Sequence, residues 1–322
     1  MTFRSFRRAD SFSIGFFINF VVDYVLGDMK HLLTLILLLS SLTATAIERR
    51  ALVIGIGTYA DKSWAKINGD RDVPIVTKML RNAGYAHIRT LVNSQATKAA
   101  IVDAFRSLTA ECRTGDIVYI HFSGHGQEVT DIDGDERLRG GGAYDQSWVP
   151  YDASLRYCAS DRGNRHLIDD ELAALLTAIH KKVGAAGKIL VVADACHSGG
   201  STRCDDNDTA RGAFDTFVIP KPAKTPKPKN YAENWITISA CKSYQTNYEL
   251  RSPKCGKITY ALSIIAGEGN SISNIQALKR INDFINNNPP LECQTPTITG
   301  NTSMCNIFDF LLKNDKKSNK NP

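Results

Sequence analysis

Apolar runs alternate with amphipathic segments along most of the chain. Six runs are typical of strands: residues 51–57, 87–92, 116–124, 188–194, 235–241 and 295–299. Between and after them, apolar residues recur three and four positions apart, which predicts helices at 72–85, 97–108, 169–182, 257–267 and 273–288. Strands that alternate with helices of this length predict an α/β fold, with a mostly parallel central sheet covered by helices on both faces.

Local signals set some of the expected boundaries. Pro74 is expected in the first turn of the helix at 72–85, and Gly84 should end that helix. Thr97 is expected to cap the next helix. The glycine- and acid-rich stretch at 125–152 is expected to be a loop.

The N-terminal region has the pattern of a secretory signal. Met29 and Lys30 precede the apolar run HLLTLILLLSSL and then TATA, so we expect a signal peptide at 29–46 and a mis-called extension at 1–28. A membrane anchor is the alternative, although neither apolar stretch reaches the ~18 residues of a span. The expected protein is secreted or periplasmic, with membrane contact only through an uncleaved signal.

Composition favours a globular protein. The 322 residues are 43% hydrophobic and carry a net charge of +6. We expect no nucleic-acid binding, because Lys/Arg runs interleaved with aromatic residues are missing. The eight cysteines include no CxxC pair, and no HExxH occurs, so zinc is not indicated. Some cysteines would pair in an oxidising compartment, for example Cys293 with Cys305. Pairing and oligomeric state stay open.

Two strand ends carry the reactive side chains. The strand at 116–124 runs into His125 and Gly126, and the strand at 188–194 runs into Cys196 and His197. Ligands bind at the carboxyl ends of parallel strands, so neighbouring strands would place these groups in one crevice. Cys196 would then be a nucleophile, His125 its base and the Gly126 N–H an oxyanion donor. The alternative is a buried thiol beside a tight loop. His197 is the less favoured base, since neighbouring side chains diverge.

These motifs resemble those of a known family. HFSGHGQ, followed by DACHSGG about seventy residues later, resembles the caspase-like cysteine peptidases, and ALVIGIGTY and YDQSWVPYDA narrow this to the metacaspases, of a bacterial type with a secretion signal. The resemblance runs from about 50 to 300. It implies a caspase-like peptidase domain, here at 47–312 with a basic linker at 219–232 and a polar tail at 313–322. It also implies endopeptidase activity after Arg or Lys on protein or peptide substrates.

The resemblance assigns an acidic pocket for the basic side chain to Asp72, Ser123 and Asp194. Ser123 and Asp194 each stand two residues before a reactive residue, and so point the same way along their strands. Fixed carboxylates suit a guanidinium or ammonium group. The alternative role of Asp72 is to cap the helix that follows it, and Asp70 is its rival for the pocket.

The resemblance also implies a need for calcium. The metal ligands that it implies are Asp145, Asp169, Asp170 and Asp205. Asp205 is included because Arg203 occupies the place of the family's fourth aspartate. Clustered carboxylates suit a hard cation. The alternative role of Asp169 is to cap the N-terminus of its helix. The stretch DIDGDE at 131–136 resembles the front of a calcium loop but lacks its distal glutamate, so we interpret it as an acidic loop, with calcium contact as the less favoured alternative.

An enzyme of this specificity would meet cleavable bonds in its own chain. The candidates for self-cleavage are Lys224, Lys229 and Arg211, whereas Lys221 and Lys227 precede proline. A merely solvated linker is the alternative. The alternative function is a non-catalytic caspase-like protein-binding module. A redox protein that pairs Cys196 with Cys204 is a third, weaker hypothesis.

Overall fold

The computed structural model describes residues 47–138, 144–196, 208–213, 215–220, 233–289, 294–303 and 305–313. The expected extension and signal peptide, most of the basic linker and nearly all of the polar tail lie outside these ranges. None of the helices in the described part is long and apolar enough to cross a bilayer.

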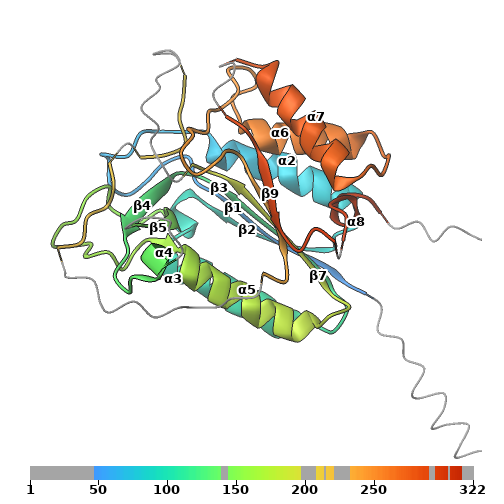
Figure 1. Ribbon diagram of the computed structural model, residues 1–322, viewed down its shortest axis with the longest axis horizontal. Coiled ribbons are helices and arrows are strands. Elements are labelled where there is room, and N and C mark those ends of the chain that lie inside the picture. Colours follow the sequence, from blue (N-terminus) through green and yellow to red (C-terminus); the bar gives the residue numbers. More distant parts are fainter. Residues whose placement is uncertain are drawn as a thin grey trace, which may run out of the picture. The chain divides into compact units, whose positions relative to one another are not determined.

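A six-stranded sheet forms the centre of the molecule (Figure 1). Its order is β2-β1-β3-β7-β8-β9, and the pairs are parallel except for β8 with β9. Its strands are β1 (Arg49–Gly55), β2 (His87–Val92), β3 (Ile117–Ser123), β7 (Lys188–Asp194), β8 (Ile236–Ser239) and β9 (Thr297–Gly300). All six predicted strands are therefore confirmed.

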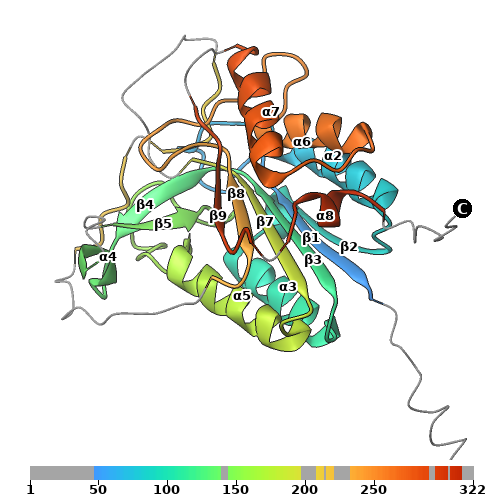
Figure 2. The same cartoon turned by 45° about the vertical axis from the view of Figure 1, so that its right-hand side comes forward.

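Helices cover both faces of this sheet, as Figure 2 shows. On one face lie α3 (Lys98–Glu111) and α5 (Asp169–Val183). On the other lie α2 (Gly69–Asn82), α6 (Lys257–Gly267), α7 (Asn274–Asn286) and α8 (Phe308–Leu311). Alternate strand residues supply the two cores: Leu52 and Ile54 pack toward α3, whereas Ala51 and Val53 pack toward α2. This explains the continuous apolar runs of the central strands.

The loop expected at 125–152 is instead partly ordered into a second sheet. It contains β4 (Gly126–Thr130), β5 (Tyr144–Trp148) and the short helix α4 (Asp135–Leu138). β5 pairs with β4 on one side and with β6 (Leu167–Ile168) on the other. The strands escaped detection because they are short and bury polar residues, Gln127 and Ser147, instead of alternating cleanly. In the figures this small sheet lies at one end of the large one (Figures 1 and 2).

One expected helix start and two expected helix caps are wrong. Helix α2 begins three residues early, so Pro74 falls beyond its first turn and Asp72 lies inside the helix instead of capping it. The early start follows from Gly69, where a Cβ would lie 2.5 Å from the backbone oxygen of Ser123, so only glycine lets the helix approach the sheet this closely. Asp169 is the first residue of α5 and not its cap, which is Ile168. The Thr97 cap is confirmed by its hydrogen bond from the Ala100 N–H, at 3.2 Å.

The single 3-10 turn among the described residues, η1 (Asn93–Gln95), connects β2 to α3. Its Asn93 accepts hydrogen bonds from the backbone of Gly57 and Thr58, and so fixes the loop that follows β1. The same asparagine donates to Asp70 Oδ2 at 3.2 Å. These contacts hold Asp70 at the rim of the sheet, away from the acidic pocket described below.

Candidate active site

The two reactive strand ends are neighbours. β3 and β7 pair in parallel, with Ser123 opposite Asp194 at their carboxyl ends. His125 and Cys196 each follow two residues later, at the same edge of the sheet. This confirms the predicted adjacency of the strands. His197 lies outside the described residues.

A segment of the same chain, residues 208–213, crosses this edge in an extended conformation. The Arg211 N–H donates to the Asn247 carbonyl at 2.9 Å, and the Glu249 N–H donates to the Thr209 carbonyl at 2.9 Å. These bonds form an antiparallel bridge between Ala210 and the loop after β8. The 208–213 segment is therefore held by main-chain hydrogen bonds, in the way an enzyme groove holds a peptide.

The carbonyl oxygen of Arg211 receives two backbone hydrogen bonds. The Cys196 N–H lies 3.0 Å from it and the Gly126 N–H lies 3.3 Å from it. Donors at these distances, aimed at one carbonyl oxygen, form the arrangement that stabilises an oxyanion when that carbonyl is attacked. Gly126 is the residue that the sequence analysis predicts as an oxyanion donor.

The thiol of Cys196 lies beside the peptide bond that follows this carbonyl. Cys196 is fully buried, and its Sγ donates to the Gln245 carbonyl at 3.3 Å. A Cβ added at Gly212 would lie 2.7 Å from this Sγ and 2.9 Å from the Cys196 carbonyl oxygen. The thiol thus lies against the Arg211–Gly212 junction, and that junction tolerates no side chain at position 212.

His125 is held by an aromatic pocket and one hydrogen bond. Its ring lies 5.0 Å from that of Trp64 and 5.2 Å from that of Tyr59. Its Nε2 lies 2.9 Å from the carbonyl of Ala65, which only accepts, so Nε2 carries the proton and Nδ1 the lone pair. Nδ1 has no hydrogen-bond partner among the described residues. Burial lowers the pKa of His125 to about 4, so the imidazole is neutral at physiological pH.

The side chain of Arg211 enters a closed acidic pocket. Its Nη1 lies 2.7 Å from Asp72 Oδ2, 3.2 Å from Asp194 Oδ1 and 2.6 Å from Ser123 Oγ, and its Nε donates to Glu249 Oε1 at 3.0 Å. All five side chains are buried. The structure thus brings together the three pocket residues proposed from the sequence, around an arginine of the same chain.

The pocket carboxylates are fixed by their own partners. Asp194 accepts hydrogen bonds from Asn247 Nδ2 at 2.8 Å and Thr259 Oγ1 at 2.6 Å. Burial opposes the ionisation of Asp194, but Arg211 and these donors outweigh it and hold its pKa below the ordinary value. Burial raises the pKa of Asp72 to about 6, against the lowering effect of Arg211. The pocket therefore keeps excess negative charge around a single cation.

Glu249 is the pocket residue that the sequence reasoning missed. It comes from the loop after β8 and also accepts a hydrogen bond from the Asn68 N–H at 2.6 Å. The sequence signal for Glu249 was an acidic residue in SACKSYQTNYE. It lies ten residues beyond the end of β8, the strand that pairs in parallel with β7. Asp70, the rival for the role of Asp72, does not enter the pocket.

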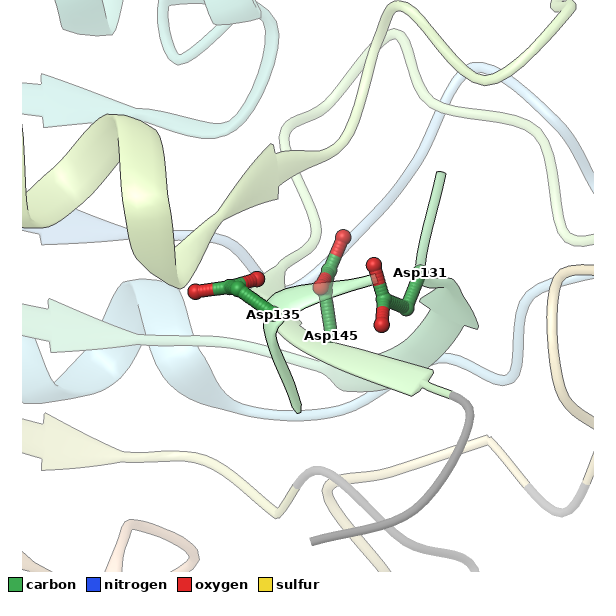
Figure 3. A group of neighbouring side chains, drawn as sticks. All are labelled: Asp131, Asp135 and Asp145. Carbon is green, nitrogen blue, oxygen red and sulfur yellow. The ribbon is translucent and has the colours of Figure 1, made fainter. Parts of the chain in front are cut away.

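An acidic cluster lies in the second sheet, where Figure 3 shows three carboxylates side by side. Asp131, Asp135 and Asp145 offer oxygen atoms within 4.8 Å of one another, and Asp133, Asp135 and Asp170 do the same. Asp131 and Asp135 come from the DIDGDE stretch, for which the sequence favours an acidic loop over a calcium contact. Among the described residues, this stretch therefore contributes carboxylates to the acidic cluster.

Two of the aspartates expected to bind metal carry raised pKa values. Burial first, then Asp169, Asp131 and Asp170, raises the pKa of Asp145 to about 8. Burial, then Glu136 and Asp170, raises the pKa of Asp169 to about 7. Asp145, Asp169 and Asp170 therefore lie close together, as expected, whereas Asp205 lies outside the described residues.

Asp145 gives a test of whether these residues fit a cation. Its side chain is 4% exposed, and its Oδ1 has no hydrogen-bond partner among the described residues. A buried carboxylate oxygen without a donor is costly unless a cation neutralises it. Oxygen-rich clusters of this kind suit calcium.

The described cysteines form no disulfide with one another. They are Cys112, Cys158, Cys196, Cys241, Cys255 and Cys305. Cys293, the expected partner of Cys305, lies outside the described residues, as does Cys204.

Comparison with known sequences identifies relatives of this chain. A family model described as the caspase domain (peptidase C14) matches residues 48–306. Metacaspase-1A of Aspergillus niger is 30% identical and metacaspase-1 of Emericella nidulans 29% identical, each over 162 residues that cover 47% of this chain. The match covers 36% of each relative, so this chain corresponds to about a third of their length.

Comparison with solved structures supports the same fold. Protein GSU0716 from Geobacter sulfurreducens is 25% identical, with a TM-score of 0.59 over 83% of this chain and 99% of that chain. Caspase-1 from Spodoptera frugiperda is 12% identical, with a TM-score of 0.50 over 79% of this chain and 86% of that one. This chain and caspase-1 therefore share a fold, in which helices flank a mixed sheet.

Proposed function

Because the chain belongs to the caspase-domain family of cysteine peptidases, we propose that it is an endopeptidase that cuts after arginine or lysine through Cys196 and His125. One observation carries the proposal. Arg211 fills the acidic pocket, while its carbonyl accepts the Cys196 and Gly126 N–H groups. The chain thus presents one of its own arginines as a substrate would be presented.

The proposed mechanism uses groups in fixed positions. His125 Nδ1, which carries the lone pair, accepts the proton of the Cys196 thiol, and the thiolate attacks the carbonyl carbon. The N–H groups of Cys196 and Gly126 hold the negative charge that develops on the oxygen. The imidazolium then protonates the leaving amine, and a water activated by the same imidazole hydrolyses the thioester. The bond from Nε2–H to Ala65 keeps the ring in the required tautomer.

The pocket explains why a basic residue would be selected. Asp72, Asp194 and Glu249 surround one site with three carboxylates, so a cation is attracted and an aspartate side chain is repelled. Glu249 contacts Nε of Arg211, an atom that lysine lacks. A lysine would reach Asp72 and Asp194 but leave Glu249 without this bond, so arginine should be preferred to lysine.

The test is a panel of fluorogenic peptides that differ only in the residue before the cut. We expect kcat/KM to fall from arginine to lysine to aspartate, with the aspartate peptide at least about 10³-fold slower, because like charges in contact cost several kcal/mol. Turnover should be measured in excess calcium and in chelator. Intact, folded protein without turnover of any basic peptide would instead support the non-catalytic binding module.

Self-cleavage is proposed at the Arg211–Gly212 bond. Incubation with calcium should produce a fragment whose N-terminal residue is Gly212, detected by N-terminal sequencing or mass spectrometry. Gly212→Ala should slow this cut strongly, because the new Cβ meets the Cys196 thiol and carbonyl. Lys224 and Lys229 lie outside the described residues and remain alternatives, and a first cut there would contradict the assignment of Arg211.

Calcium binding is proposed at the acidic cluster, with Asp131, Asp135, Asp145 and Asp170 among the residues that would hold the ion. When bound, calcium would neutralise the cluster and hold Asp131 and Asp135 against Asp145 of β5. β4, which leads to Asp131, begins at Gly126 directly after His125, so fixing the far end of β4 would steady one side of the reactive edge.

Calcium should therefore stabilise the protein. At a concentration about 100-fold above its dissociation constant, the gain in unfolding free energy should be about 2.7 kcal/mol. Differential scanning calorimetry with Cys196→Ala protein should show the rise in Tm and its reversal by chelator. Asp145→Asn should abolish the rise, whereas Asp103→Asn, on the exposed face of α3, should leave it unchanged. An equal response in both variants would place the ion elsewhere.

A further inference from the structure

A second thiol lies next to Cys196. Cys241 follows β8 by two residues, and β8 pairs with β7 on the side opposite β3. The Sγ atoms of both cysteines donate to the same acceptor, the Gln245 carbonyl, each at 3.3 Å. Cys196 is also close enough to raise the pKa of Cys241. They therefore lie at one point of the reactive edge, from adjacent strands.

The surroundings suit a covalent bond between them. Adjacent strands lie about 4.8 Å apart, within the range of about 4.4–6.8 Å that separates the Cα atoms of bonded cysteines. Cys241 also lines a cleft of about 750 Å³, together with Ser239 and Lys242. The cleft therefore gives small oxidants and reductants a route to Cys241, and none of the residues 208–213 lines it.

We propose that Cys241 is a resolving cysteine, which captures oxidised Cys196 in a reversible disulfide and thereby switches the site off. A peroxide is the oxidant. The Cys196 thiolate attacks one peroxide oxygen and the O–O bond breaks, so the sulfur becomes a sulfenic acid and the second oxygen leaves as water after protonation. The Cys241 sulfur then attacks the sulfenic sulfur, the S–S bond forms, and the sulfenic oxygen leaves as a second water with the Cys241 proton. The two thiols together supply the two electrons that reduce the peroxide.

The disulfide would have two consequences. It removes the nucleophile, so the site is inactive until a thiol reductant restores it. It also halts oxidation before the irreversible sulfinic and sulfonic acids. The pKa of Cys241 is raised well above its ordinary value, by its hydrogen bond to Cys196 and then by burial, so Cys241 remains a thiol in the reduced state. Only the consequence for activity rests on the proposed function, because the bond itself requires just the two cysteines.

The test is treatment of the full chain with hydrogen peroxide, followed by blocking of free thiols and peptide mass spectrometry without reduction. We expect a linked pair of peptides containing Cys196 and Cys241, lighter than the two free peptides by two hydrogen atoms and separated by dithiothreitol. Peptidase activity should be lost on treatment and return with dithiothreitol. Cys241→Ser should give sulfinic acid at Cys196 and a loss that dithiothreitol does not reverse. Cys112→Ser, altered at a buried cysteine after α3, should behave like the parent.

Two results would overturn the proposal. One is Cys196 that is oxidised to sulfinic acid equally in the parent and in Cys241→Ser. The other is a linked pair in which Cys196 joins a cysteine other than Cys241. A disulfide between Cys196 and Cys241 in a protein that cleaves no peptide would support the thiol pair and count against the proposed function alone. The two proposals therefore fail in distinguishable ways.

Discussion

Replacing Cys196 by alanine is expected to abolish both the cut at Arg211–Gly212 and the hydrolysis of arginine peptides. The thiolate is the atom that forms the bond to the substrate, and neither neighbouring water nor His125 can replace it. Loss of a nucleophile in comparable hydrolases lowers kcat by about 10⁴–10⁶-fold. The measurement is the initial rate with an arginine fluorogenic peptide, together with the mass of the purified protein after incubation with calcium.

Two controls separate chemistry from folding. Cys112→Ala removes another buried thiol, remote from the carboxyl ends of the strands, and should retain activity. His125→Ala should lose nearly as much activity as Cys196→Ala, and the double variant should be no worse, because nucleophile and base act as one unit. A Cys196→Ala protein that cleaves as fast as the parent would remove Cys196 from the mechanism.

Much of the fold follows from local pattern. The strands at 188–194 and 116–124 are apolar enough to identify, and the parallel-sheet rule places their ends together. The small sheet was missed because Gln127 and Ser147 are buried by pairing with other polar groups and not by apolarity. Such partners lie far away in sequence, so no local window contains the signal.

The site residues also fall into two groups, those that the strand pattern predicts and those that long-range contacts place. His125, Cys196 and the pocket residues Ser123 and Asp194 stand on strands or directly after them, so the pattern that predicts the strands also orders the residues. Glu249 stands on a loop whose path depends on the whole fold. The position of Arg211 in the pocket is likewise set by long-range pairing, with Asn247 on one side and Gly126 on the other. The sequence offered Arg211 only as one of three cleavable residues.

The second large effect concerns the stability of the uncut chain. In a Cys196→Ala background, which prevents cleavage, Arg211→Gln is expected to lower the unfolding free energy at neutral pH by about 3–5 kcal/mol. Removing one partner from a buried ion network leaves the others uncompensated, and here three carboxylates remain: Asp72, Asp194 and Glu249. Thermal melting at pH 7 is the measurement. Arg156→Gln, which breaks an exposed pair with Asp215, should change stability by less than about 1 kcal/mol.

The pH dependence of this loss distinguishes electrostatics from packing. In the parent, the pKa of Asp194 is lowered, so its contribution is present above its unfolded pKa and is lost as pH falls through the folded value. Without Arg211, the pKa of Asp194 should rise above its unfolded value, and the pKa of Asp72, which is already raised to about 6, should rise further. The variant therefore binds more protons when folded and gains stability as pH falls. The gap between parent and variant should therefore narrow from pH 7 toward pH 4. A gap that stays constant over this range would mean that the variant loses packing alone.

Filling the pocket from outside completes the test. An arginine amide added to the Arg211→Gln protein should raise its Tm, since it supplies the missing guanidinium to the same three carboxylates. The parent should not respond, because its own Arg211 holds the pocket closed. A lysine amide should raise the Tm less, because it has no atom for the bond that Glu249 makes to Nε. This difference would measure, without any catalysis, the preference for arginine that the proposed peptidase should show toward its substrates.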